Sequence, residues 1–228
     1  MKYKVLLFDA DGTLFDFNQS EKEVFYELLK ALKVEDRYDE YNEIYHVENH
    51  KVWEELEKGL ISQEDLKVER FRRFLNRVQL DVDAKMCANL FMELLSKSSI
   101  LLEGAYDLIK NLSKDYKIVI VTNGLKEVQP LRVRNSVLKS FLAATVISDE
   151  INIQKPNPEI LEYTLKLINH TNKSEVLMIG DRLQSDILVG VNAGIDTLWY
   201  NPDKVENKSK IMPTYEVDSF ESLFNLLK

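Results

Sequence analysis

The chain has 228 residues, of which 45% are hydrophobic and 10% are aromatic. This content is ample for the packed core of one large domain or two modest ones, so we expect a folded globular protein. With 38 acidic and 30 basic residues the formal net charge is −8, which argues against a long-range field that would gather a nucleic acid polymer. An anionic substrate must therefore meet local positive charge, from a metal ion, a lysine or the amino ends of helices.

Cysteine content and hydropathy bear on the cellular setting. Cys87 is the single cysteine, so an internal disulfide is impossible, and its place within an apolar run predicts a buried thiol. No apolar stretch approaches the roughly 20 residues of a membrane span, and the first residues do not have the layout of a signal peptide. These features predict a reducing, cytoplasmic setting with no membrane partner.

The first chemical signal is the segment KYKVLLFDADGTLFD, residues 2–16. Its apolar run over residues 5–8 fits a strand that is buried on both faces, and Gly12 permits the sharp turn that would follow. Asp9 and Asp11 then stand at the carboxyl end of a buried strand, which is the edge where ligands bind in open α/β sheets. The segment alone fits equally well a strand that is stopped by a polar turn.

Residues 20–98 are predicted to form four helices with short connections. Ser20 and Glu23 form a capping box ahead of the first helix. A second helix is expected over residues 39–58, and a third begins near Ser62. The fourth carries apolar residues at helical spacing, namely Met86, Leu90, Phe91, Leu94 and Leu95. Four helices joined by short loops predict a compact bundle with its own core.

Beyond Gly104 the pattern changes to strands in alternation with helices. The segments KIVIVTNG, ATVISDE, EVLMIGD and IDTLWYN are short β-branched runs, each separated from the next by a helical stretch. This alternation is typical of a parallel sheet, to which the first strand belongs by composition. We therefore predict an α/β fold with a doubly wound parallel sheet, residues 1–16 and 99–228, into which an α-helical domain, residues 17–98, is inserted.

Polar residues follow the first, second and fourth strands of this sheet, and a lysine follows the third. In chain order the set comprises Asp9, Asp11, Thr122, Asn123, Gly124, Lys155, Asp181 and Asp186. If the strands are adjacent and parallel, these groups converge on one crevice. Carboxylates packed together repel one another, and such clusters persist around a hard divalent cation, which is typically Mg²⁺ where phosphate is also a ligand. The sequence thus predicts a Mg²⁺ site at this edge.

These residues resemble a known family, and the resemblance covers nearly the whole chain. In order, the four motifs of the haloacid dehalogenase-like (HAD) hydrolases are matched by DADGT at residues 9–13, by Thr122, by Lys155-Pro156, and by Gly180-Asp181 with Asp186. The fold implied is a Rossmann-like core, and the helical block lies where the family carries its α-helical cap. The segments TLFDFNQSE, TNGLKEVQ and AGIDTLWYNP are similar to the branch that contains pyrimidine 5′-nucleotidases.

The resemblance implies separate roles for the two aspartates of the first motif. Asp9 would be the nucleophile that attacks phosphorus and becomes an aspartyl phosphate, which divides one difficult displacement into two easier ones. Asp11 would protonate the leaving alkoxide and then activate water, a contribution of about 10²–10⁴-fold for a positioned acid or base.

The resemblance also implies the metal ligands and the phosphate-binding groups. Mg²⁺ would be held by the carboxylates of Asp9 and Asp181 and by the backbone carbonyl of Asp11, with Asp186 acting directly or through water. The phosphoryl oxygens would be bound by Thr122, the amides around Asn123 and Gly124, and Lys155.

The function implied is that of a Mg²⁺-dependent phosphomonoester hydrolase that acts through an aspartyl phosphate. The predicted substrate is a pyrimidine nucleoside or deoxynucleoside monophosphate, and the predicted state is a monomer or weak homodimer. Another phosphorylated metabolite, or a phosphoglucomutase-like phosphotransfer, would use the same core motifs. A dehalogenase is disfavoured because that chemistry lacks the second aspartate of the motif, Asp11 here. A non-catalytic binding protein would be expected to have lost a core group, and all are present.

A few positions depart from the family pattern or suggest another site. Arg182 stands where a small polar residue is common, and it would either contact substrate or pair with a carboxylate. Asn152 stands where glycine is common, although asparagine tolerates left-handed backbone. His46 and His50 are four apart on a helix, but the zincin pattern needs glutamate directly after the first histidine, whereas Glu48 is two residues on. We expect surface histidines there.

Overall fold

The computed structural model describes residues 2–228, which divide into two compact units. The sheet unit comprises the chain up to Phe17 together with Ser99–Lys228, and the helical unit comprises Asn18–Ser98. Within residues 2–228 no helix is both long and apolar enough to cross a membrane.

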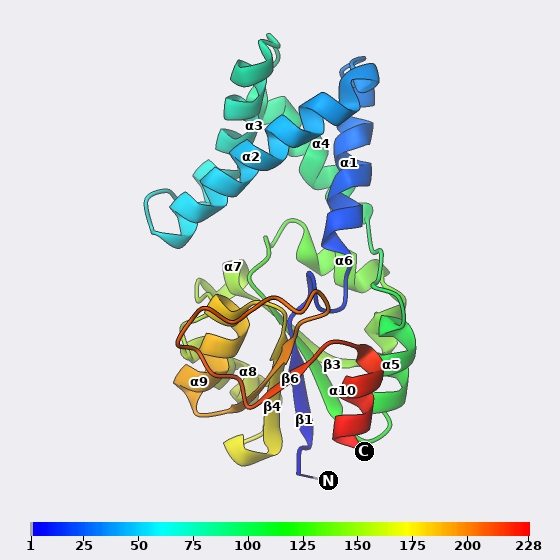
Figure 1. Ribbon diagram of the computed structural model, residues 1–228, viewed down its shortest axis with the longest axis vertical. Coiled ribbons are helices and arrows are strands. Elements are labelled where there is room, and N and C mark those ends of the chain that lie inside the picture. The colour runs from blue at the N-terminus through cyan, green and yellow to red at the C-terminus, as the bar shows by residue number, and fades with distance from the viewer. Residues whose placement is uncertain (1) are drawn as a thin grey trace. The chain divides into compact units, whose positions relative to one another are not determined.

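The sheet unit contains six parallel strands in the order β3-β2-β1-β4-β5-β6 (Figure 1). Their bounds are Val5–Phe8 (β1), Lys117–Thr122 (β2), Leu142–Ile147 (β3), Val176–Gly180 (β4), Asp196–Tyr200 (β5) and Tyr215–Val217 (β6). From β1 the chain builds outward through β2 and β3, then returns to the other side of β1 with β4. This reversal is the switch point of a doubly wound sheet, so the predicted fold class is confirmed.

Helices cover the two faces of this sheet. Their bounds are Ala105–Leu112 (α5), Gln129–Asn135 (α6), Ser148–Ile151 (α7), Glu159–Leu167 (α8), Leu188–Ala193 (α9) and Phe220–Leu227 (α10). Short 3₁₀ turns lie at Val137–Phe141 (η2) and Lys173–Glu175 (η3), and a π-helical turn lies at Leu183–Ile187 (η4).

The first strand shows how alternation builds both cores. Leu6 and Phe8 pack into a cluster with α5 and α10, whereas Val5 and Leu7 pack into a cluster with α8 and α9. All four side chains are buried, as expected for a strand inside a parallel sheet. Burial on both faces explains why this strand reads as an uninterrupted apolar run.

The helical unit packs around aromatic side chains. Its helices are α1 (Phe17–Ala31), α2 (Tyr38–Glu57), α3 (Gln63–Val78) and α4 (Ala84–Lys97), with a 3₁₀ turn, η1, at Glu35–Arg37. The ring of Phe25 stacks on Tyr45 at 4.4 Å between centroids and meets the edge of Phe74 at 5.3 Å. Phe71 lies 5.5 Å from Tyr45 and 5.2 Å from Phe91. Offset and edge-to-face pairs of this kind add to the energy of apolar burial.

Helix starts show where local signals succeed and fail. The predicted cap at Ser20 is wrong, because α1 already begins at Phe17 and Ser20 is buried within it. At α3 the local signal holds: the Ser62 hydroxyl accepts from the Asp65 amide at 3.1 Å, and the Asp65 carboxylate accepts from the Ser62 amide at 3.2 Å. Strand β6 and helix α10 were not predicted at all.

Truncating a ring in the aromatic core should cost the helical unit much of its stability. Phe74 is fully buried and contacts three other rings, so Phe74→Ala should lower the free energy of unfolding by about 3–5 kcal/mol. Urea denaturation followed by circular dichroism measures this change. Leu60→Ala, at a side chain 69% exposed, should change it by less than about 0.5 kcal/mol. A loss below about 1 kcal/mol for Phe74→Ala would contradict the packing described.

Candidate active site

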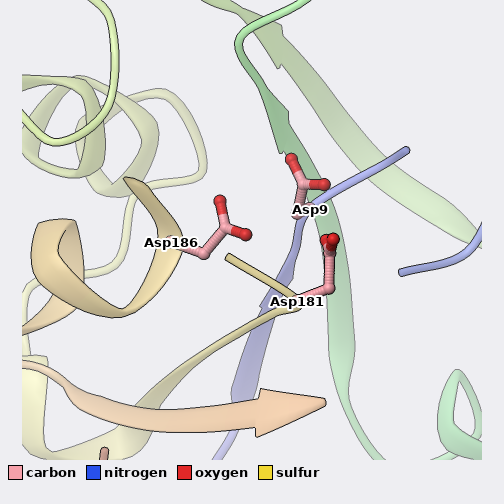
Figure 2. Close-up of side chains that lie close together, drawn as sticks. All are labelled: Asp9, Asp181 and Asp186. Atoms are coloured by element: carbon pink, nitrogen blue, oxygen red, sulfur yellow. The ribbon is translucent and has the colours of Figure 1, made fainter. Parts of the chain in front are cut away.

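Three carboxylates gather at the carboxyl edge of the sheet, next to its switch point. Asp9 follows β1 directly, Asp181 follows β4 directly, and Asp186 lies in the η4 turn that leads into α9. One carboxylate oxygen from each residue lies within 4.8 Å of the others, and Figure 2 shows the side chains pointing toward one another. Asp9 and Asp186 are buried, and Asp181 is half-buried. Carboxylate oxygens in such an array are suitable ligands for a hard divalent cation.

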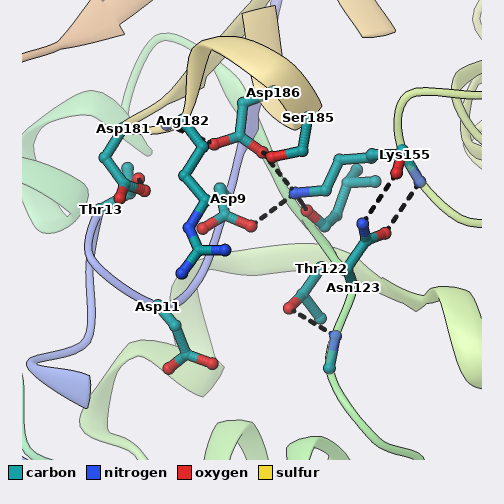
Figure 3. A network of polar contacts seen from close by, with 12 residues as sticks. Asp9, Asp11, Thr13, Thr122, Asn123, Lys155, Asp181, Arg182, Ser185 and Asp186 are labelled. Carbon is teal, nitrogen blue, oxygen red and sulfur yellow. Dashed lines mark hydrogen bonds and ion pairs between the residues drawn. The ribbon is translucent and has the colours of Figure 1, made fainter. Parts of the chain in front are cut away.

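Lys155 brings one positive charge into this cluster (Figure 3). Its Nζ lies 2.5 Å from Asp9 Oδ1 and 2.7 Å from Asp186 Oδ1, and it donates to the Val121 carbonyl at 2.8 Å. These contacts use all three ammonium donors. Lys155 is buried, and a buried ammonium is tolerated only when it is paired in this way.

The side chain of Asn123 fixes the backbone from which Lys155 extends. Its Oδ1 accepts from the Lys155 amide at 2.8 Å, and its Nδ2 donates to the Lys155 carbonyl at 2.9 Å. The neighbouring Thr122 Oγ1 accepts from the Gly124 amide at 3.2 Å. The loop after β2 thus holds the backbone of Lys155 through the side chain of Asn123. The backbone amides of the same loop remain the candidates for phosphate binding.

The remaining bonds orient the acidic groups. Asp186 Oδ2 accepts from the Arg182 amide at 2.9 Å, and its Oδ1 also accepts from the Ser185 hydroxyl at 3.2 Å. Asp181 Oδ1 accepts from the Thr13 hydroxyl at 2.9 Å. The indole of Trp199, on β5, donates to the Asp181 carbonyl at 2.8 Å.

Two glycines leave space for the carboxylates of the cluster. A Cβ on Gly12 would lie 2.6 Å from Asp181 Oδ2, and the backbone φ of Gly12 is +85°, in the left-handed region. A Cβ on Gly180 would lie 2.4 Å from the carboxylate of Asp186. The turn after β1 and the last residue of β4 therefore cannot carry a side chain without displacing a carboxylate.

Burial and mutual repulsion dominate the electrostatics of the cluster. Burial raises the pKa of Asp9 well above its ordinary value, and the charges of Asp186 and Asp181 raise it further, whereas Lys155 opposes them. Burial and the charge of Asp186 raise the pKa of Asp181 to about 6, against the opposing Thr13 hydrogen bond and Arg182 charge. For Lys155, burial lowers the pKa, but Asp186 and Asp9 together raise it above its ordinary value. One lysine does not neutralise three carboxylates, so the donor set fits a divalent cation.

Asp11 stands apart from this cluster. Figure 3 shows its carboxylate directed away from that of Asp9. Its Oδ1 accepts from Arg132 Nη1 at 2.6 Å, and its Oδ2 accepts from Gln129 Nε2. The carboxylate of Asp11 is therefore not a member of the metal-type group, and only its backbone carbonyl, as predicted, remains a candidate ligand.

Sequence reasoning missed Gln129 and Arg132. Both lie on α6, which begins five residues after Gly124, and their spacing of three places them on one helix face. That spacing, directly after the second motif, was a signal that could have been used. Arg182 is exposed and acts on Asp181 by charge.

The histidine pair does not join a metal-type cluster. His46 Nδ1 lies 3.5 Å from Glu21, and His50 Nδ1 lies 3.7 Å from Glu54. Within the part of the chain that the structure describes, the only metal-type group of histidine, cysteine and acidic residues is the aspartate trio. Asn152, as the sequence suggested, has a left-handed backbone with φ of 55°.

The geometry defines an α/β protein with an anionic, metal-type site at the switch point of a doubly wound sheet. Comparison with known proteins supports this class. The family model "haloacid dehalogenase-like hydrolase" matches residues 3–194. The chain therefore belongs to the haloacid dehalogenase-like hydrolases, which confirms the predicted family, and it is a hydrolase.

Three relatives are similar over 96% or more of their length. The pyrimidine 5′-nucleotidase PynA of Streptococcus pneumoniae is 37% identical over 228 residues, which span 100% of this chain and 96% of PynA. The pyrimidine 5′-nucleotidase YjjG of Escherichia coli is 33% identical, spanning 100% of this chain and 99% of YjjG. The structure of the HAD-hydrolase YfnB of Bacillus subtilis, bound to magnesium, superimposes with a TM-score of 0.90 at 32% identity and covers both chains completely.

A divalent metal should stabilise the protein, and more strongly above pH 6 than below. The pKa of Asp181 is raised to about 6 in the folded protein. Without metal, the folded state therefore binds this proton more tightly than the unfolded state does, and protonation stabilises the fold. That contribution is present at low pH and is lost as pH rises through the folded pKa. Metal takes the place of the proton, so the shift in melting temperature caused by Mg²⁺ should be larger at about pH 7.5 than at about pH 5.

The size of this shift follows mass action. Free metal at about 100 times its dissociation constant adds about 2.7 kcal/mol to the stability of the folded state. Asp186→Asn should remove most of the shift, whereas Asp107→Asn, at an exposed position on α5, should retain it. An equal melting temperature with Mg²⁺ and with excess chelator at about pH 7.5 would refute the metal assignment.

Proposed function

We propose that this protein is a Mg²⁺-dependent phosphomonoester hydrolase, and that its substrates are pyrimidine nucleoside and deoxynucleoside 5′-monophosphates. The observation that supports it most is the position of the Asp9 carboxylate. One oxygen of this group is held by Lys155, and the group lies beside two further carboxylates that fit a divalent cation. Similarity to PynA and YjjG over the full chain supports the choice of a pyrimidine nucleotide.

In the first step Asp9 attacks phosphorus. A bond forms between its carboxylate oxygen and phosphorus while the bond from phosphorus to the leaving oxygen breaks, and Asp11 gives that oxygen a proton. In the second step water attacks the same phosphorus, Asp11 takes a proton from the water, and the aspartyl–phosphorus bond breaks. The Lys155 ion pair fixes the orientation of the Asp9 carboxylate for the attack in the first step.

The charge on the transferring phosphoryl group must be stabilised. When bound, Mg²⁺ supplies positive charge next to the phosphoryl oxygens, and its proposed ligands are the carboxylates of Asp9, Asp181 and Asp186 and the carbonyl of Asp11. The amides around Asn123 and Gly124 and the hydroxyl of Thr122 are the proposed protein donors. Lys155 has three protein acceptors, so it contacts phosphate only by exchanging one of them for a phosphoryl oxygen.

The helical unit is proposed to act as the cap that selects the nucleoside. Several aromatic rings of this unit are not available to stack on a base, since Phe25, Tyr45, Phe71 and Phe74 pack against one another. Partly exposed rings in this unit, such as Trp53, remain candidates. Base recognition by stacking is therefore proposed to use the partly exposed rings of this unit and not those of its aromatic core.

The substrate proposal predicts a preference among nucleotides. Pyrimidine monophosphates, including deoxy forms, should show a higher kcat/KM than purine monophosphates or hexose phosphates, because one base fits the selecting residues better. Phosphate release from a matched panel of these compounds measures the preference. Equal turnover of purine and pyrimidine nucleotides, or a preference for a hexose phosphate, would contradict the substrate assignment and leave the phosphatase chemistry to be judged separately.

Asp11→Asn should separate the two chemical steps. Loss of the acid and base should slow hydrolysis of nucleotides by about 10²-fold or more. With an aryl phosphate the phenolate leaves without a proton, so the first step should survive, and phosphoenzyme on Asp9 should accumulate because water is not activated. Mass spectrometry detects the adduct, and Asp9→Asn is the matched control that should give neither turnover nor adduct. Wild-type turnover by Asp11→Asn with no adduct would show that the assigned roles are wrong.

A further inference from the structure

We propose that Gln129 and Arg132 on α6 are positioning residues that hold the Asp11 carboxylate for proton transfer. The pair is called the α6 clamp below. This inference rests on the proposed function, in which Asp11 is the acid and base, and it assigns a task to two residues that lie outside the four motifs.

Each carboxylate oxygen of Asp11 has its own donor in the clamp. Arg132 Nη1 donates to Oδ1 at 2.6 Å, and Gln129 Nε2 donates to Oδ2. The side-chain oxygen Oε1 of Gln129 accepts from Arg132 Nη1 at 3.4 Å. Donors on both oxygens fix the plane of the carboxylate. Each oxygen keeps a second lone pair, which is the one available to carry a proton to or from the reacting groups.

Burial of Arg132 makes its ion pair with Asp11 costly to break. Arg132 is fully buried, and its guanidinium lies 5.3 Å from the ring centre of Phe15 and 5.7 Å from that of Phe17. The Ser99 hydroxyl donates to the Arg132 carbonyl at 2.9 Å, which anchors the helix at this residue. A buried guanidinium needs an anion at a fixed place, so releasing Asp11 from the clamp carries an energetic penalty. The position of Asp11 is therefore set by the surroundings of Arg132 as well as by its own backbone.

The second motif is shaped to admit the clamp. A Cβ on Gly124 would lie 2.2 Å from Gln129 Cγ and 2.4 Å from its Nε2. Glycine at this position is what lets the Gln129 side chain pass the loop and reach Asp11. The loop that is proposed to bind phosphate and the residues that hold the acid are thus packed directly against each other.

The test compares two substrates that differ in their need for an acid. For each variant, kcat is measured with a nucleoside monophosphate, whose leaving alkoxide needs a proton. The rate of the first-turnover burst is measured with an aryl phosphate, whose leaving phenolate needs none. Gln129→Leu and Arg132→Met should lower the nucleotide rate relative to the aryl burst by about 10-fold or more, which is part of the about 10²–10⁴-fold that a positioned acid supplies. Gln129→Leu carries the test on its own if Arg132→Met fails to fold. Arg134→Met, an exposed residue on the same helix, should leave both rates unchanged.

A second comparison separates positioning from general damage. In an Asp11→Asn background, Gln129→Leu should not change the ratio of the two rates further, because the clamp acts through Asp11. A parallel fall of both rates, or an undiminished effect in that background, would overturn the clamp. If Asp11→Asn alone left the ratio unchanged, the assignment of Asp11 in the proposed function would fail and the clamp with it. If Asp11→Asn shifted the ratio and the clamp variants did not, only the clamp would be wrong.

Discussion

The concentration of negative charge at one edge of the sheet constrains the rest of the site. Three carboxylates meet where β1 and β4 end, two of them buried, and Lys155 pairs with Asp9 and Asp186. Burial makes each unpaired charge costly, so the array needs further positive charge and a rigid frame. The backbone of Lys155 is held by Asn123, and the carboxylates are held by the bonds to Thr13 and to the Arg182 amide.

The same constraint separates the two aspartates of the first motif. Asp9 lies inside the anionic cluster, where Lys155 holds it, and Asp11 lies outside, where a buried arginine and a glutamine hold it. Different partners on different elements allow two residues of one loop, only two positions apart, to take different chemical roles.

Five of the six strands could be predicted from the sequence because each is a short local run of apolar and β-branched residues. Residues 5–8 form an apolar run whose burial is set by helices on both faces. The close approach of the Asp181 and Asp186 carboxylates to Gly12 and Gly180 is seen only in the folded chain. The predicted start of α1 was wrong because Ser20 offers a plausible cap, whereas the helix begins three residues earlier, at Phe17. The partners of Lys155, and the contact of Gln129 and Arg132 with Asp11, join residues more than 30 positions apart. No local pattern encodes such pairings, so only the folded chain reveals them.

The central claim is that phosphate passes through the Asp9 carboxylate, and chemical trapping tests it most directly. Wild-type protein is quenched within one turnover of a pyrimidine nucleotide in the presence of Mg²⁺ and is then treated with borohydride, which reduces an acyl phosphate to an alcohol. Peptide mass spectrometry should find reduction at Asp9, only when substrate and metal are both present. Reduction at Asp11 or Asp181 instead, or full release of phosphate with no reduced aspartate, would contradict the account.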